Sequence, residues 1–180
     1  MFSLGDKVVY PGHGVATITR ILEKAMGGEL TLFYELTFVG KGMIILVPCN
    51  ALNCGVRPLS SQELIDSLFD TLSKPVKKLP VTDLANNWKQ RNKEYQLRLR
   101  TGNIRDISAI YQELKHIEQQ KELSFCEKNL LCHTETMLAE EIALVKQLQE
   151  EKAAEQLRSC FKRYGTVLKG IRRLPIEHEQ

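Results

Sequence analysis

Several features that would place this sequence in a common functional class are missing. No apolar run approaches the roughly 18 residues that a membrane-spanning helix needs. The N-terminus, MFSLGDKVVYPG, has no basic segment followed by a long apolar stretch. We therefore expect no signal peptide, no membrane contact and a cytoplasmic location. The sequence also has no phosphate-binding glycine loop of the P-loop or dinucleotide type.

Cysteine is scarce and irregularly placed. The cysteines are Cys49, Cys54, Cys126, Cys132 and Cys160. An odd number in a chain without a signal peptide argues against a disulfide framework. No pair has the two-residue spacing of a zinc knuckle. The four histidines have no nucleophile or base partner that the sequence indicates. We therefore expect no metal, no cofactor and no enzymatic activity.

Charge is distributed unevenly, although the net charge is only +3. Residues 74–105 contain nine Lys or Arg and two Asp or Glu, a net charge of +7, whereas residues 106–156 carry a net charge of −6. A basic segment of this kind predicts attraction to a polyanion such as nucleic acid. Within the acidic segment, four glutamates are interpreted as a solvated helix face: Glu140, Glu141, Glu150 and Glu151.

The first third of the chain has the pattern of short strands. Apolar runs rich in β-branched and aromatic residues alternate with Gly and Pro turns. The expected strands are 7–10, 15–22, 30–39, 43–47 and 55–57. Short strands with tight turns over about 55 residues predict a small, strongly bent sheet or barrel.

The rest of the chain has the apolar period of helices. Helices are predicted over 60–72, 82–100, 103–123 and 124–148, and residues 149–160 could extend the last one. The Ser124-Phe125-Cys126-Glu127 sequence is a capping box that predicts where the last of these helices begins. Two prolines between residues 74 and 80 indicate a linker. These patterns predict an α+β, two-domain chain: a β-domain (1–58), a helix and linker (59–80), a helical domain (81–160) and a basic C-terminal tail (161–180) that we expect to be loosely packed.

Three segments are similar to a known family. FSLGDKVVYPGHGVATI, MIILVP and NNWKQRNKEY resemble the CarD/CdnL family of bacterial transcription regulators, and the resemblance extends over about residues 1–150. It implies a Tudor-like, SH3-like small β-barrel followed by an all-α helical bundle. It also implies that the barrel binds the RNA polymerase β subunit by strand addition. The bundle would contact promoter DNA near the upstream edge of the transcription bubble and stabilise the open complex. We expect a monomer.

The resemblance also assigns residues to the polymerase contact. By position in the family, these are Lys24, Met43, Ile44, Ile45 and Leu46. Side chains of a strand alternate between faces, so some members of the set must belong to the core. Leu46 stands where relatives often carry a basic residue, which favours a more apolar interface.

The assigned DNA contacts surround the single tryptophan of the chain: Trp88, Lys89, Arg91, Lys93 and Arg98, with Arg100 following. Trp88 has two interpretations. It could be a wedge in a widened minor groove, with cations on the phosphates. It could instead be core, because Leu84, Trp88, Tyr95 and Leu99 share one helical stripe. Burial tendencies favour the core, and the family position favours the wedge.

Two other functions are compatible with the residues. The chain could bind nucleic acid without sequence preference and without touching polymerase. It could also be a helical scaffold that binds proteins only. An exposed Trp88 beside a basic helix face would favour DNA binding, and a tryptophan that is fully core would not.

Overall fold

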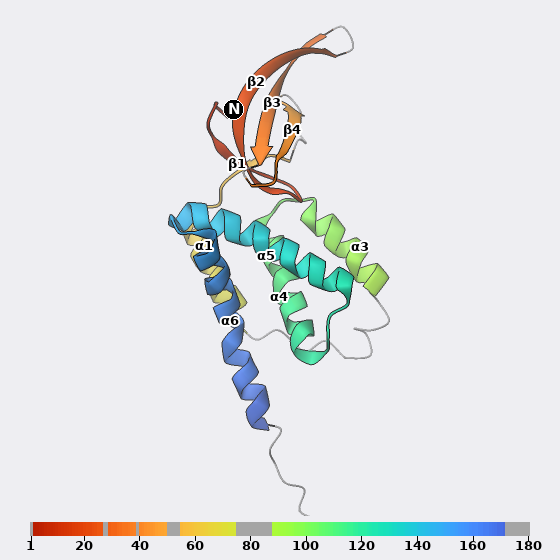
Figure 1. Cartoon of the computed structure of the whole chain (residues 1–180), viewed down its shortest axis with the longest axis vertical. Coiled ribbons are helices and arrows are strands. Elements are labelled where there is room, and N and C mark those ends of the chain that lie inside the picture. The colour runs from red at the N-terminus through yellow and green to blue at the C-terminus, as the bar shows by residue number, and fades with distance from the viewer. Residues whose placement is uncertain (1, 27–28, 39, 50–54, 75–87, 172–180) are drawn as a thin grey trace, which may run out of the picture.

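The computed structural model describes residues 2–26, 29–38, 40–49, 55–74 and 88–171, with side chains of the last helix described as far as Phe161. An antiparallel sheet forms one end of the molecule, and helices form the rest (Figure 1). The two-domain α+β architecture predicted from the sequence is confirmed, with a Tudor-like sheet preceding the helices. None of the described helices is long and apolar enough to cross a bilayer.

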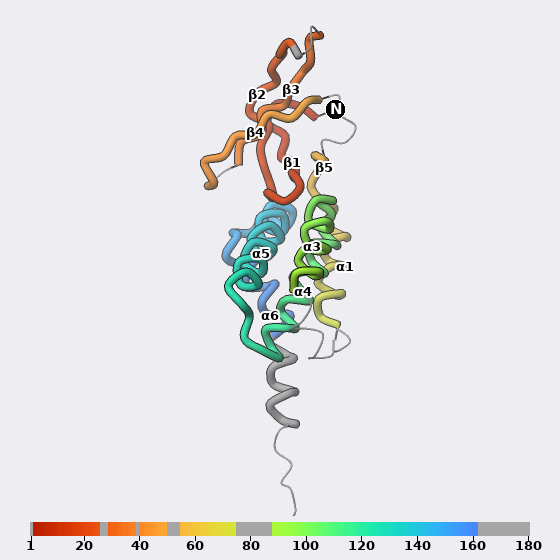
Figure 2. The backbone as a smooth tube through the Cα atoms, turned by 90° about the vertical axis from the view of Figure 1, so that its right-hand side faces the viewer, coloured from red at the N-terminus to blue at the C-terminus, as the bar shows by residue number. Residues whose placement is uncertain are grey.

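The sheet contains β1 (Lys7–Tyr10), β2 (Gly14–Met26), β3 (Glu29–Phe38), β4 (Met43–Pro48) and β5 (Arg57–Pro58), in the order β4-β3-β2-β1-β5. β2 and β3 are longer than the other strands, and their hairpin curves away from the helices (Figures 1 and 2). A register shift between Ile18 and Arg20 marks a bulge in β2, a feature that bends a strand and increases its twist.

The apolar core of the sheet comes from alternate residues of neighbouring strands. Val8, Ala16, Ile18, Tyr34, Leu36, Phe38 and Val47 are buried together. Cross-strand partners point to the same face, so the pairs Ile18–Leu36 and Tyr34–Val47 set the register of this core. β4 is an outermost strand, and only one of its sides pairs with a described strand.

The described helices are α1 (Gln62–Leu72), α3 (Trp88–Leu99), α4 (Ile104–Gln120), α5 (Phe125–Lys146) and α6 (Glu150–Ile171). The predicted capping box is confirmed: the Ser124 hydroxyl accepts from the Glu127 amide, and the Glu127 carboxylate accepts from the Ser124 amide. The predicted helix start near residue 82 lies outside the described residues. So do Cys54 and most of the predicted linker.

Two predicted features at the C-terminal end differ from the structure. Residues 149–160 do not extend α5, because Gln147 adopts a left-handed conformation with φ 55° and ends that helix. α6 begins after this turn, and its backbone is helical to Ile171, inside the tail predicted over 161–180.

One apolar core joins the helices. It includes Ile65 and Leu68 of α1, Tyr111 and Leu114 of α4, and Leu138 of α5, all nearly inaccessible to solvent. Because α1 contributes to this core, it packs as part of the helical domain. The region predicted as helix and linker therefore begins with an integral helix of the bundle.

Candidate functional site

The outermost strand β4 has the alternation that an edge binding site requires. Met43 and Ile45 are half-buried against the core of the sheet. Ile44 is 61% exposed and Leu46 is 37% exposed on the opposite face. The edge therefore offers main-chain groups for pairing and two apolar side chains beside them.

Lys24 lies away from β4, in the hairpin of β2 and β3. It is exposed and pairs with Thr31, whereas β4 pairs with β3 only from Phe33 onward. Alternate residues of a strand share a face. The chain of pairs from Thr31 through Thr37 therefore places Lys24 on the same face of the sheet as Ile44 and Leu46.

Trp88 is the first residue of α3, and its side chain is neither fully exposed, as a wedge would be, nor fully buried, as a core residue would be. The side chain is half-buried and packs against the edge of the helical core. The Arg91 guanidinium carbon lies 5.8 Å from the centroid of its ring, within cation–π range. The predicted stripe is confirmed for Tyr95 and Leu99, which are buried. Leu84 lies outside the described residues.

The five residues assigned to DNA fall on two faces of α3. Arg91 and Arg98 point toward the bundle. Arg91 pairs with Glu127 at 3.2 Å, and Arg98 pairs with Glu113 at 3.1 Å. The Arg91 side chain is only 15% exposed. The neighbouring Tyr95 is only 2% exposed, so this face is poorly hydrated, and the burial raises the pKa of the Tyr95 hydroxyl. The charge of both arginines is directed to partners inside the fold.

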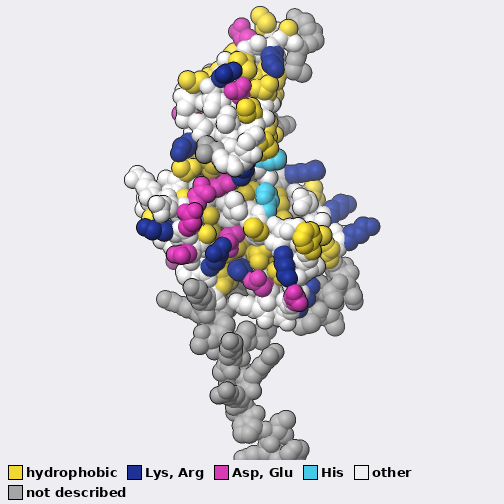
Figure 3. Space-filling model, viewed as in Figure 1, with side chains coloured by type: hydrophobic (Ala, Val, Ile, Leu, Met, Phe, Trp, Pro, Cys, Tyr) yellow, Lys and Arg dark blue, Asp and Glu magenta, His cyan; other side chains and the backbone are white. Residues whose placement is uncertain are grey.

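The opposite face of α3 is basic and exposed. Lys89, Lys93 and Arg100 are exposed, and their spacing places them within about 40° of one another around the helix axis. We call these three residues the basic stripe. Lys and Arg side chains project from the side of the molecule that α3 forms (Figure 3). Leu97, 56% exposed, lies on the same face.

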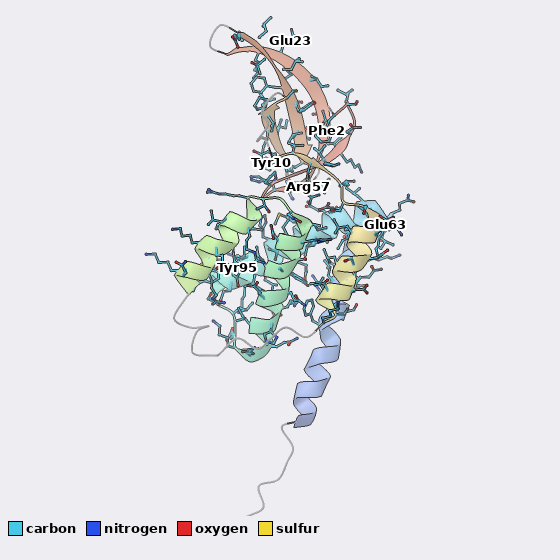
Figure 4. All side chains as sticks on the ribbon, turned by 180° about the vertical axis from the view of Figure 1, so that it is seen from behind. Phe2, Tyr10, Glu23, Arg57, Glu63 and Tyr95 are labelled. Atoms are coloured by element: carbon cyan, nitrogen blue, oxygen red, sulfur yellow. The ribbon has the colours of Figure 1, made fainter. Side chains whose placement is uncertain are left out.

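Glu141 of α5 connects the two domains. Its carboxylate, in a side chain only 2% exposed, accepts two hydrogen bonds from Arg57 of β5, at 2.6 and 2.8 Å. It also accepts from the amide and hydroxyl of Ser60, at 2.9 and 2.7 Å. Arg57 further donates to the carbonyl of Gly102, at 2.6 Å. Figure 4 shows Arg57 at the junction of the sheet and the helices.

Glu140 makes a second connection, to the start of β2 and to the turn that precedes β4. Its carboxylate pairs with Lys41 at 2.6 Å and accepts from the Val15 amide at 3.2 Å. On the same helix, His133 Nε2 lies 2.9 Å from the carbonyl oxygen of Gly12. The junction is therefore polar and contacts α5 at several points along its length.

These contacts correct the interpretation of the acidic residues. Glu150 and Glu151 are exposed, as expected, but Glu140 and Glu141 are not solvated, because the sheet covers their face of α5. A sequence signal existed for Glu141. It lies three residues after Leu138 and one before Ile142, both buried, and so belongs to the apolar stripe of the helix.

His13 lies in the turn of the first hairpin and stacks on Tyr10 with ring centroids 5.6 Å apart. Burial, together with the nearby His133 and Lys41, lowers the pKa of its imidazole. Among the described residues, no group of three or more His, Cys, Asp or Glu could hold a metal ion.

Comparison with known families covers both domains. Residues 2–60 match the CarD-like/TRCF RID domain, the RNA polymerase-interacting type, and residues 68–158 match the C-terminal domain of CarD. The chain belongs to the CarD family. A CarD-like relative, YdeB of Bacillus subtilis (strain 168), whose name proposes a transcription factor, is 26% identical over 153 residues. The match covers 84% of this chain and 97% of YdeB.

Membership of the CarD family relates the fold to transcription regulation. The strand edge of β4 lies in the polymerase-interacting domain, and the basic stripe lies in the C-terminal domain of CarD. The junction around Glu140 and Glu141 joins the two.

Proposed function

We propose that this protein is a non-enzymatic bridge between the RNA polymerase β subunit and promoter DNA. The sheet binds the β subunit by strand addition at β4. The helical domain contacts DNA near the upstream edge of the transcription bubble and stabilises the open complex. The observation that carries this proposal is the combination of a β4 edge that pairs with no described strand and an exposed basic stripe, on domains joined by ion pairs whose glutamates are largely buried.

The polymerase contact is supported by the exposed side of β4. A partner strand gains main-chain hydrogen bonds along this edge, and Ile44 and Leu46 add apolar contact on one face. Leu46 makes this face apolar together with Ile44. Met43 and Ile45 position the strand through the core, and Lys24 borders the same face from the hairpin.

The DNA contact is supported by the basic stripe and the adjacent Trp88. Lys89 and Arg100 are separated by about 16 Å along the axis, at about 1.5 Å per residue. The stripe could therefore contact successive phosphates of one backbone. The half-buried Trp88 leaves part of its indole available for a groove or an unstacked base. Arg91 and Arg98 orient the helix and the indole.

The bridge explains how a few DNA contacts can have a measurable effect. Once the sheet is bound to polymerase, the stripe meets DNA at high effective concentration. Stabilising the open complex by about 1–2 kcal/mol changes its population roughly five- to thirtyfold. Such contacts recognise phosphate and groove shape, so sequence preference should be low.

The test is the lifetime of open complexes after challenge with a competitor, with full-length variants. Trp88→Ala should shorten the lifetime severalfold while binding to the β subunit is unchanged. Ile44→Lys, which places a charge on the strand edge, should abolish both the binding to the β subunit and the stabilisation of the open complex. Lys152→Gln, on the exposed side of α6, is the matched control.

Two results would contradict the proposal. An unchanged open-complex lifetime for a folded Trp88→Ala variant would show that the indole does not stabilise the open complex. DNA binding without any binding to the β subunit would instead identify a stand-alone nucleic-acid-binding protein.

A further inference from the structure

The hairpin of β2 and β3 extends beyond the strand that borders it. β4 ends at Pro48, opposite Phe33, whereas β3 begins at Glu29 and β2 reaches Met26. We call residues 21–26 and 29–32 the hairpin arm. The arm projects from the sheet, away from the helical domain (Figures 1 and 2). Its side chains therefore contribute little to either hydrophobic core.

One face of the hairpin arm is apolar and uncovered. Ile21 is 42% exposed, Leu30 is 76% exposed and Leu32 is 39% exposed. Ile21 pairs with Tyr34, and Leu30, Leu32 and Tyr34 alternate along β3, so the register places all of them on the core face of the sheet. We call Ile21, Leu30 and Leu32 the arm stripe. The stripe continues the core face past the point where the core itself ends.

An acidic side chain lies beside the arm stripe. Glu23 is exposed, pairs across the hairpin with Leu32 and shares its face, whereas Glu29 pairs with Met26 and lies on the opposite face from Leu30. Figure 4 shows Glu23 toward the end of the hairpin, far from the junction at Arg57. Grouped apolar side chains on a soluble protein commonly mark an interaction site. An acidic side chain beside the stripe favours a partner segment with Lys or Arg beside its apolar residues.

The arm stripe also has a defined position relative to β4. A strand paired with β4 lies two strand spacings, about 9.6 Å, from β3. Where β4 ends at Pro48, a partner segment that turned inward toward β3 would bring its core-face side chains to Leu32 and Leu30. Ile44 and Leu46 lie on the other face of the sheet, so the edge and the arm stripe would contact both faces of one partner segment.

We propose that the arm stripe is a second binding surface for the RNA polymerase β subunit. It binds an apolar segment with basic flanks that follows the strand paired with β4. This inference rests on the proposed function, and it adds the hairpin arm as a determinant of affinity and partner choice.

The test is the Kd of full-length variants for the purified β subunit of the same organism. Leu30→Thr/Leu32→Thr keeps strand propensity and should raise the Kd about tenfold or more, through lost apolar contact. Glu23→Lys should raise it by a smaller factor, mainly through slower association. The control is Lys152→Gln on the exposed side of α6, in the helical domain and outside both proposed β-subunit surfaces. We expect a change within twofold.

The outcomes separate this inference from the function on which it rests. If the unmodified protein does not bind the β subunit, the proposed function fails. A second outcome refutes only the role of the arm stripe. In that outcome the unmodified protein binds the β subunit and Ile44→Lys weakens this binding, but Leu30→Thr/Leu32→Thr does not. If the double variant no longer gives the circular dichroism spectrum of the folded protein, the Kd of the single variant Leu30→Thr replaces it as the test. A side chain as exposed as Leu30 supports no core, so this variant should fold. A dimer in light scattering that this variant converts to a monomer would assign the stripe to a second copy instead.

Discussion

Replacing Glu141 with alanine should destabilise the protein far more than removing any exposed acid. The carboxylate is buried and accepts four hydrogen bonds, two from Arg57 and two from Ser60. Removing one partner of a buried ion pair typically costs about 3–5 kcal/mol, because the other charge stays buried and unpaired. The Arg57 side chain is 23% exposed and can gain some water, so we expect about 3 kcal/mol.

A loss of this size is a large part of the total free energy of unfolding of a small domain. Small domains unfold with about 5–15 kcal/mol, so Glu141→Ala should lower the urea midpoint visibly in circular dichroism. Glu155→Ala, an exposed acid on α6, is the matched control and should change the free energy of unfolding by less than about 0.5 kcal/mol. A loss below about 1 kcal/mol for Glu141→Ala would refute the argument that this ion pair is effectively buried.

Glu141→Ala also tests whether the junction between the domains is needed for the proposed bridge between the β subunit and DNA. Glu141 connects β5 and the start of α1 to α5, so its loss should loosen the orientation of the helical domain relative to the sheet. We expect Glu141→Ala to bind the β subunit as before but to shorten the open-complex lifetime. A double-mutant cycle with Arg57→Ala should give a coupling free energy of at least about 2 kcal/mol. Full activity in a destabilised variant would show that domain orientation does not matter.

Three further results are expected. Replacing the basic stripe with glutamine should reduce the slope of log affinity against log salt by about 2.7 for duplex DNA, measured by anisotropy, because three phosphate contacts are lost. Burial opposes the negative charge of Glu127, but hydrogen bonds from Ser124 and the nearby Lys121 outweigh burial and lower the pKa of the carboxyl group. The free energy of unfolding should therefore fall as the pH drops below about 4.5. The fall should be smaller in Glu127→Gln, measured by urea denaturation. Gly14→Ala should lower the melting temperature, because φ is +91° there and the new methyl would meet the Glu140 carboxylate.

Local patterns were sufficient to predict the elements of the fold but not their contacts. Alternation and turn residues predicted β1 and β4 almost to their observed limits, and the capping box at Ser124 predicted the start of α5. Both signals lie within a few residues of chain. The break at Gln147 was missed because it depends on one left-handed residue, and the charged residues after it are compatible with either a continuous or a new helix.

The candidate site shows a different limit. The direction of a helical side chain depends on which face meets the core, so the phase of Tyr95 and Leu99 could have shown that Arg91 and Arg98 turn inward. The partners of those arginines, Glu127 and Glu113, lie on α5 and α4. No local pattern identifies such partners, because they meet only when the bundle forms.

The pairing of those arginines changes what the basic segment can do. A net charge of +7 over residues 74–105 suggests strong binding to DNA. Among the described residues of α3 and the residue that follows it, Arg100, the exposed and outward cations are the three of the basic stripe. About three phosphate contacts give an affinity that falls steeply with salt and is weak without further contacts. A stripe of this size can act on a promoter only when another surface holds it there. We therefore expect the strand edge of β4 to be as necessary for the proposed DNA contact as the stripe, so that losing either abolishes the effect on the open complex rather than halving it.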